Sequence, residues 1–247
     1  MDMLLEGAFW VALSQIMLVN IVLSGDNAVV IALAARGLPA KQQKRAVAWG
    51  SGAAVVMRIA LTIVAVELLR LSYLKLAGAV LLLWIAVKLL VPEEGTEGHG
   101  TARASMAAAV KTILLADLVM SLDNVIAVAA AAEQGPAETK LLLLIIGLGL
   151  SIPIVIFGSV MMLKVMERFP IIITLGAALL GWIAGDIMVT DPAIVGWVKA
   201  NAAWLHDWKA APVAGALFVV ALGKWIARKK PEAAEIRPAN EVQNPNS

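Results

Sequence analysis

The sequence predicts an all-α integral membrane protein with seven transmembrane helices, built from two inverted three-helix repeats and a seventh helix. Three observations carry this prediction. The chain is unusually apolar, it contains seven segments of membrane-spanning length, and the same Asp-Asn motif lies inside two of those segments, 97 positions apart.

Composition places the chain in the membrane class. Of its 247 residues, 61% are hydrophobic and 15% are charged, whereas a soluble globular chain carries about 25% charged residues. A bilayer-spanning helix needs about 20 apolar residues, and helices are expected because lipid cannot satisfy free backbone polar groups. The segments that meet this requirement are 8–35, 46–69, 71–91, 106–132, 141–163, 171–189 and 211–227.

Basic residues set the expected orientation, because cytoplasmic loops are enriched in Lys and Arg. The stretch 36–45 carries four basic residues and no acid, and the stretch 224–230 carries four more. With seven spans both stretches lie on one side, so the N-terminus is expected outside and the C-terminus in the cytoplasm. The resulting units are a first repeat at 1–92, a cytoplasmic loop at 93–105, a second repeat at 106–190, an outer interfacial segment at 191–210, a seventh helix at 211–228 and a disordered cytoplasmic tail at 229–247.

The outer segment contains three tryptophans on one predicted helical face, Trp197, Trp204 and Trp208. Tryptophan is favoured at the membrane–water interface, which predicts a short helix lying in the outer interface. The alternative is that these side chains pack on the helical bundle.

An internal repeat underlies the predicted architecture. At an offset of 97, the stretch 14–36 matches 111–133 at nine of 23 positions, and at an offset of 98 the stretch 76–90 matches 174–188 at seven positions. The repeating unit therefore contains three helices. An odd number of spans inverts the second copy in the membrane, and inverted repeats are a recurring transporter plan with the site where the copies meet.

The candidate site consists of Asp and Asn residues inside the two motif-bearing segments. An aspartate in hydrocarbon costs roughly 2.5–3.5 kcal/mol on insertion scales, so its duplication indicates function, although hydrogen bonding between helices is a structural alternative. Carboxylate and amide oxygens form a hard ligand set, which suits Mg²⁺, Ca²⁺ or Mn²⁺. The candidate metal ligands are Asp26, Asn27, Asp117, Asp123, Asn124 and Asn20.

Spacing limits which of these side chains point together. Asn20 and Asp117 each precede a key aspartate, Asp26 or Asp123, by six residues. Six residues of regular α-helix leave two side chains about 120° apart, so a local helix break would be needed to aim both at one ion. The pair Ser24-Gly25 is a candidate break, whereas the second copy has a leucine where the first has the glycine.

Three further residues are accessory candidates, each with a structural alternative. Arg58 lies midway along the second segment and is expected to pair with an intramembrane aspartate, either to compete with the cation or as a purely structural ion pair. Met120 offers a soft thioether ligand that could discriminate Mn²⁺ from Mg²⁺ and Ca²⁺, or it fills space in the core. Asp186 could receive the ion at the outer mouth, or it is a solvated charge at a helix end.

Several classes of partner are excluded or left open. The chain has no cysteine, which excludes disulfides and thiolate metal sites, and its net charge of +2 is too small to indicate nucleic acid. The expected partners are a divalent cation and the lipid bilayer, with homo-oligomerisation left open. No tightly bound cofactor is expected.

The motifs resemble those of the TerC family of bacterial membrane proteins, and within it the YjbE-type branch. The resemblance covers about residues 5–228 and rests on three stretches, 23–28, 120–125 and 176–186. It implies seven helices with the N-terminus outside, Mn²⁺ export connected with tellurite resistance, and Asp26, Asp117 and Asp123 in the metal path. One departure is Asn20, where the family pattern has Asp, so the site would lose one charge.

The leading hypothesis is a Mn²⁺ exporter that works by alternating access of the two repeats; an enzyme is not expected. A second hypothesis is an intramembrane aspartyl protease, in which Asp26 and Asp123 would share a proton. Against it, each aspartate carries a matched asparagine, and a Gly-x-Gly-Asp motif does not occur. A third is a non-transporting scaffold in metal or tellurite stress, and an exporter of organic cations or amino acids is a further alternative.

Overall fold

The computed structural model describes residues 7–68, 71–91 and 105–229, all of which are helical or in connecting turns. No strand occurs within these ranges, so the predicted all-α class is confirmed. The predicted loop at 93–105 and tail at 229–247 lie, except for residues 105 and 229, outside the described residues. The helices are α1 (Gly7–Val22), α2 (Gly25–Ala35), α3 (Ala40–Leu68), α4 (Leu74–Leu90), α5 (Met106–Ala132), the 3₁₀ helix η2 (Ala137–Thr139), α6 (Lys140–Gly149), α7 (Ile152–Arg168), α8 (Ile171–Val189), α9 (Val195–Asn201), α10 (Trp204–Asp207) and α11 (Ala210–Lys229).

Five helical segments of the described chain are long and apolar enough to cross a membrane, and six if α1 and α2 are one bent span. The five are α3, α5, α6 with α7, α8 and α11. Helix α4 has 17 residues, which is about 26 Å at 1.5 Å per residue and slightly short of the usual 20-residue span. Seven spans therefore stays a prediction.

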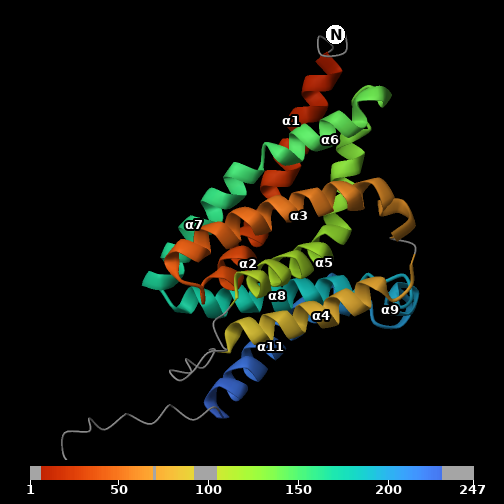
Figure 1. Cartoon of the computed structure of the whole chain (residues 1–247). Coiled ribbons are helices and arrows are strands. Elements are labelled where there is room, and N and C mark those ends of the chain that lie inside the picture. The colour runs from red at the N-terminus through yellow and green to blue at the C-terminus, as the bar shows by residue number, and fades with distance from the viewer. Residues whose placement is uncertain (1–6, 69–70, 92–104, 230–247) are drawn as a thin grey trace, which may run out of the picture.

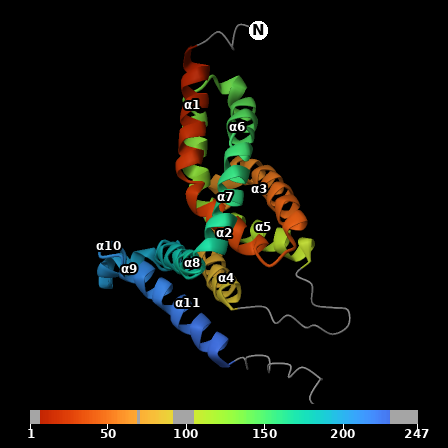
Figure 2. The same ribbon diagram turned by 90° about the vertical axis from the view of Figure 1, so that its left-hand side faces the viewer.

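The helices form two regions that meet at α3 and α5. In Figure 1, α4, α8 and α11 lie together in the lower part of the molecule, whereas α1 and α6 lie in the upper part. Figure 2 shows α1 and α6 side by side in the same upper region. A large apolar core joins α2, α4, α5 and α8, and a smaller one, around Phe9, Leu13 and Leu143, lies between α1 and α6.

The first predicted segment is divided by a helix break. Helices α1 and α2 meet at an angle of 49°, at the Ser24-Gly25 pair where the sequence suggested a break. The Ser24 N–H bonds to the Ile21 carbonyl, one residue short of the α-helical partner. The Asn20 carbonyl, left without that N–H, instead accepts the Ser24 hydroxyl. Side chains thus satisfy the freed backbone, as an apolar environment requires.

The fifth predicted segment contains a second break, which the sequence analysis did not anticipate. Helix α6 ends at Gly149 and α7 begins at Ile152. Pro153 lacks the N–H that the Gly149 carbonyl would accept, and Ser151 donates its hydroxyl to the Leu148 carbonyl at 2.6 Å. By contrast, α5 runs unbroken through Leu122, the residue that replaces Gly25 in the second copy.

Glycines allow the closest helix contacts, and two of these contacts correspond in the two halves. A Cβ added at Gly50 on α3 would lie 2.6 Å from Ile113 on α5, and one added at Gly147 on α6 would lie 2.5 Å from Ile16 on α1. The two glycines are 97 positions apart, as are the two isoleucines. Helices α3 and α5 therefore pack together in the same way as α6 and α1.

Helices α8 and α11 approach backbone to backbone. A Cβ at Gly181 would meet the Gly215 carbonyl, and one at Gly185 would meet the Ala211 carbonyl. This small-residue spacing is a common device for close packing in membranes. It fixes α11, the predicted seventh helix, against the second half of the chain.

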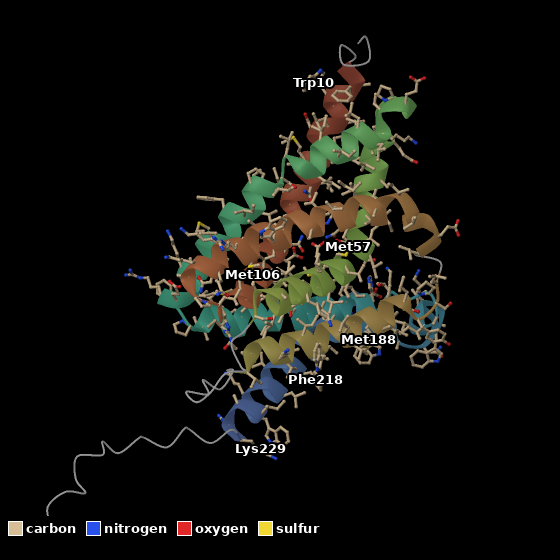
Figure 3. The ribbon with its side chains drawn as sticks, viewed as in Figure 1. Trp10, Met57, Met106, Met188, Phe218 and Lys229 are labelled. Atoms are coloured by element: carbon tan, nitrogen blue, oxygen red, sulfur yellow. The ribbon has the colours of Figure 1, made fainter. Side chains whose placement is uncertain are left out.

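The predicted interfacial segment forms two short helices, α9 and α10. Trp197, Trp204 and Trp208 are 63%, 51% and 81% exposed. These side chains are therefore not buried in the bundle, and their exposure fits the interfacial interpretation. In Figure 3, Trp10 lies at the upper end of α1.

Candidate cation site

A buried arginine on α3 lies at the centre of the polar interior. Arg58 is 4% exposed, and each of its three guanidinium nitrogens donates to a different side chain. Nη2 forms an ion pair with Asp117, Nη1 donates to Asn20 Oδ1 at 2.8 Å, and Nε donates to Ser121 Oγ at 3.0 Å. These four residues, together with Ser24 and Ser151, are called the Arg58 cluster. The expected pairing of Arg58 with an intramembrane aspartate is confirmed.

The Arg58 cluster brings together equivalent positions of the two repeats. Ser121 Oγ donates to Asp117 Oδ2 at 3.1 Å, four residues earlier on α5. In the first repeat, Ser24 Oγ bonds to the carbonyl oxygen of Asn20, also four residues earlier, and lies 3.5 Å from its Oδ1. Asn20 of the first repeat and its equivalent Asp117 of the second therefore meet at one guanidinium group, although they come from α1 and α5.

The two helix breaks meet at the same place. Asn20 Nδ2 donates to Ser151 Oγ, which links the α1–α2 break to the α6–α7 break. Asn20, Ser151, Asp117 and Ser121 are all nearly inaccessible to solvent, with at most 6% exposure. Their polar groups are hydrogen-bonded to one another, as burial in apolar surroundings demands.

Asp26 and Asn27 open α2 directly after the first break. The Asn27 N–H donates to Asp26 Oδ1 at 2.8 Å, and Asn27 Nδ2 donates to the Leu23 carbonyl at 3.0 Å. The remaining side-chain oxygen, Asn27 Oδ1, is buried without a hydrogen-bond partner. A buried oxygen acceptor without a partner is uncommon and indicates either strain or a missing ligand.

Asp123 is turned away from the Arg58 cluster. Its carboxylate forms an ion pair with Lys75 at the start of α4, and its side chain is 41% exposed, against 7% for Asp117. Because α5 is unbroken between the two aspartates, the divergence expected for residues six apart is seen here. The structure therefore places Asn20 and Asp117 in the Arg58 cluster and Asp123 in a separate contact with Lys75.

The other predicted residues lie outside these contacts. Asn124 is half-buried on α5. Met120 is 4% exposed within the large apolar core, which fits its alternative as a space-filling side chain. Asp186 is partly exposed and forms an ion pair of 3.1 Å with Lys209, which fits its alternative as a helix-end charge.

Within the described ranges, no three Asp, Glu or His side chains come close enough together to hold a metal. Any cation held at the Arg58 cluster would therefore use amide, hydroxyl or backbone oxygens as well as the Asp117 carboxylate. Such mixed oxygen sets are ordinary for hard divalent ions.

Four participants were missed by the sequence analysis: Lys75, Ser151, Thr190 and Asp191. A signal existed for two of them. Lys75 is a charge placed inside, rather than at the end of, an apolar segment, and Asp191 precedes Pro192, a pairing that favours a turn. Ser151 and Thr190 carry no comparable signal.

Helices throughout the described residues, several candidate membrane spans, and a buried charged cluster that joins equivalent positions of the two repeats define a multi-pass integral membrane protein. The chain belongs to the TerC family: the model described as integral membrane protein TerC family matches residues 5–231. The resemblance drawn from the motifs is confirmed.

Several curated membrane proteins are similar to the chain. The uncharacterized membrane protein YjbE of Bacillus subtilis is 41% identical over 187 residues, covering 76% of this chain and 83% of the relative. The uncharacterized membrane protein YkoY of the same organism is 24% identical over 254 residues, covering 95% and 78%. The UPF0053 inner membrane protein YgdQ of Escherichia coli is 31% identical over 142 residues, covering 51% and 60%. No solved structure matches the chain.

Proposed function

We propose that this protein exports divalent metal cations, with Mn²⁺ the best single candidate, across a bacterial inner membrane. The observation that carries the proposal is the Arg58 cluster, in which equivalent positions of two repeats, Asn20 and Asp117, converge on one buried positive charge. A buried charged group in a membrane protein is expensive to maintain and is therefore a functional candidate by default.

The guanidinium group of Arg58 is proposed to occupy the place of the cation in this conformation. Asn20 and Asp117 direct oxygens at it, and a hard divalent cation prefers the same carboxylate and amide oxygens. In the metal-bound state, Arg58 would withdraw and the ion would take up these oxygens. The unpartnered Asn27 Oδ1, beside Asp26, is the best candidate for a further ligand, with Asp123 and Asn124 completing the path.

Alternating access of two inverted repeats is the proposed mechanism. The corresponding glycine–isoleucine contacts of Gly50 with Ile113 and of Gly147 with Ile16 support it, because an approximate two-fold axis relating the halves would generate both from one. The proposed topology has seven spans, with α4 as the third and the N-terminus outside. Protons that replace the metal on the carboxylates would couple the cycle.

One observation favours a second candidate function. All three guanidinium nitrogens of Arg58 donate hydrogen bonds. The cluster could therefore serve only to hold α1, α3 and α5 together, without binding an ion. A membrane scaffold acting in metal or tellurite stress would need only this structural contact between the helices.

The test is Mn²⁺ uptake into inside-out vesicles containing the wild-type chain, Asp123→Asn or Asp117→Asn, with Mg²⁺ and Ca²⁺ as competitors. Uptake by the wild type that both folded variants lose supports the exporter and the path. If wild-type vesicles take up no more Mn²⁺ than empty ones, with or without an imposed proton gradient, the exporter is wrong and the scaffold is favoured. Uptake that survives both substitutions keeps transport but discards the site.

A further inference from the structure

We propose that Lys75 is a tethered cation that takes the place of the metal at Asp123 when the metal leaves, and so promotes its release. The inference rests on the proposed export function and adds a residue outside its predicted ligand set. Asp123 and Lys75 would then lie at the mouth of the proposed cation path, and the Arg58 cluster in its buried interior.

The contact geometry distinguishes this pair from an ordinary surface ion pair. Lys75 Nζ contacts Asp123 Oδ1 and lies 3.4 Å from Thr190 Oγ1 at the end of α8. The lysine side chain is 12% exposed, whereas that of the aspartate is 41% exposed. The positive charge is thus held inside the protein, while part of the carboxylate stays open to an ion from the surroundings.

The backbone that carries Lys75 is fixed by a second aspartate. Asp191 is fully buried, and its carboxylate accepts the backbone N–H groups of Tyr73 at 3.0 Å, Leu76 at 3.1 Å and Ala193 at 2.7 Å. Tyr73 has a left-handed backbone conformation, with φ of 69°, which is costly for a tyrosine and is maintained by such surrounding contacts. Asp191 therefore locks the first turn of α4 against the end of α8.

The charge state of Asp191 suits this role. Burial opposes its ionisation, but backbone N–H groups, led by that of Ala193 and including those of Tyr73, Leu76 and Lys75, together lower its pKa. The anchor is therefore ionised throughout the physiological range. The backbone that carries Lys75 therefore stays in place while its ammonium group and the metal exchange at Asp123.

The Lys75–Asp123 ion pair is weak enough to exchange with a metal ion, as promotion of metal release requires. At a water-filled mouth, as proposed here, a partly exposed ion pair is screened and contributes little to stability, so a divalent ion can displace the ammonium group from Asp123. When the ion departs, the ammonium group returns and lowers the affinity of the carboxylate for the same ion. The buried Arg58 pair, with three hydrogen bonds, exchanges far less readily.

The experiment compares Mn²⁺ binding and Mn²⁺ flux for the purified full-length chain in detergent and in proteoliposomes. For Lys75→Gln we expect Mn²⁺ affinity to rise by about 3- to 10-fold, the scale of one partly exposed ion pair, while maximal flux falls. Lys75→Arg keeps the positive charge and is expected to stay near the wild type. The matched control is Lys140→Gln, which removes the lysine of an exposed pair with Glu133 near the far end of α5.

A double-mutant cycle separates this role from a structural one. If Lys75 acts through Asp123, adding Lys75→Gln to Asp123→Asn produces no further change in affinity. Lys75→Met, which keeps the apolar stem, serves as the second variant if Lys75→Gln does not fold. A structural role predicts instead that affinity and flux fall together with the melting temperature.

Two failures are distinguishable. If the wild type moves Mn²⁺ but the Lys75 variants bind it no more tightly than the wild type, this inference is overturned and the proposed function stands. If the wild type itself neither binds nor moves Mn²⁺, the proposed function fails and the inference fails with it. The wild-type measurement alone therefore decides between them.

Discussion

Asp117 and Asp123 lie six residues apart on the same unbroken helix, yet they occupy opposite environments. The Asp117 side chain is 7% exposed and pairs with the guanidinium group of Arg58, whose three nitrogens are all hydrogen-bonded. The Asp123 side chain is 41% exposed and forms an ion pair with Lys75. The difference follows from helical geometry, since six residues place two side chains about 120° apart. One helix therefore offers a sealed charge and an accessible charge.

Two aspartates on one helix can therefore have different roles, Asp117 as a buried charge and Asp123 as an exchangeable one. A sealed carboxylate must be neutralised in place, because an unpaired buried charge is severely destabilising. An accessible carboxylate can exchange its partner at little cost. Substitutions at the two places should consequently separate stability from transport.

The largest expected effect is on stability at the sealed pair. Asp117→Leu leaves the buried Arg58 without its counter-charge, which is expected to lower the free energy of unfolding by about 3–5 kcal/mol. Thermal unfolding in detergent, followed by size-exclusion chromatography of heated samples, measures this loss.

A compensating variant sharpens the same prediction. Arg58→Met combined with Asp117→Leu removes both charges and should recover most of the stability, because apolar replacement of a whole buried pair is often neutral. Mn²⁺ transport should remain lost. Transport by this folded double variant would show that the sealed cluster is not on the path.

At the accessible pair we expect the opposite balance. Asp123→Asn should change the free energy of unfolding by less than about 1 kcal/mol, since the ion pair is partly exposed. Mn²⁺ flux into vesicles should nevertheless fall to the level of empty vesicles. A stability loss at Asp123 as large as that at Asp117 would contradict the distinction between the two places.

A loss of stability smaller than that expected at Asp117 tests whether the two halves are built alike. Gly50→Ala and Gly147→Ala each introduce a methyl group against an isoleucine, and overpacking of this kind typically costs about 1–3 kcal/mol. The cost should be larger at Gly147, because the new group meets the branched Cγ2 of Ile16 rather than the mobile Cδ1 of Ile113. Melting temperatures of the two variants provide the comparison, and a negligible cost at both would argue against matched packing.

The smallest effect concerns the anchor of Lys75. The folded pKa of Asp191 lies below its ordinary value of 3.8, so its stabilisation is complete above that value and is lost as the pH falls through the folded pKa. The melting temperature of the wild type should therefore exceed that of Asp191→Asn at neutral pH, and the two should converge in acid. A difference that persists at low pH would assign the effect to packing.

Sequence reasoning reached the helical class, the family and the importance of the duplicated motifs because these depend on local information. Hydropathy identifies the apolar segments, and an aspartate in such a segment is conspicuous wherever it lies. The break at Ser24-Gly25 was predicted for the same reason, since a glycine beside polar residues weakens a helix locally. The pairing of Arg58 with an aspartate followed from the cost of an isolated charge in lipid.

The partner of each charge was decided only by the tertiary structure. Nothing local to Asp123 indicates that Lys75, 48 residues earlier, would reach it, and nothing local to Asn20 indicates Ser151. These contacts depend on how α1, α4, α5 and the α6–α7 break pack, which is a long-range property. The sequence by itself determined which residues must be neutralised or hydrogen-bonded in the membrane. Packing decided that one aspartate is buried against Arg58 while the other stays partly exposed beside Lys75.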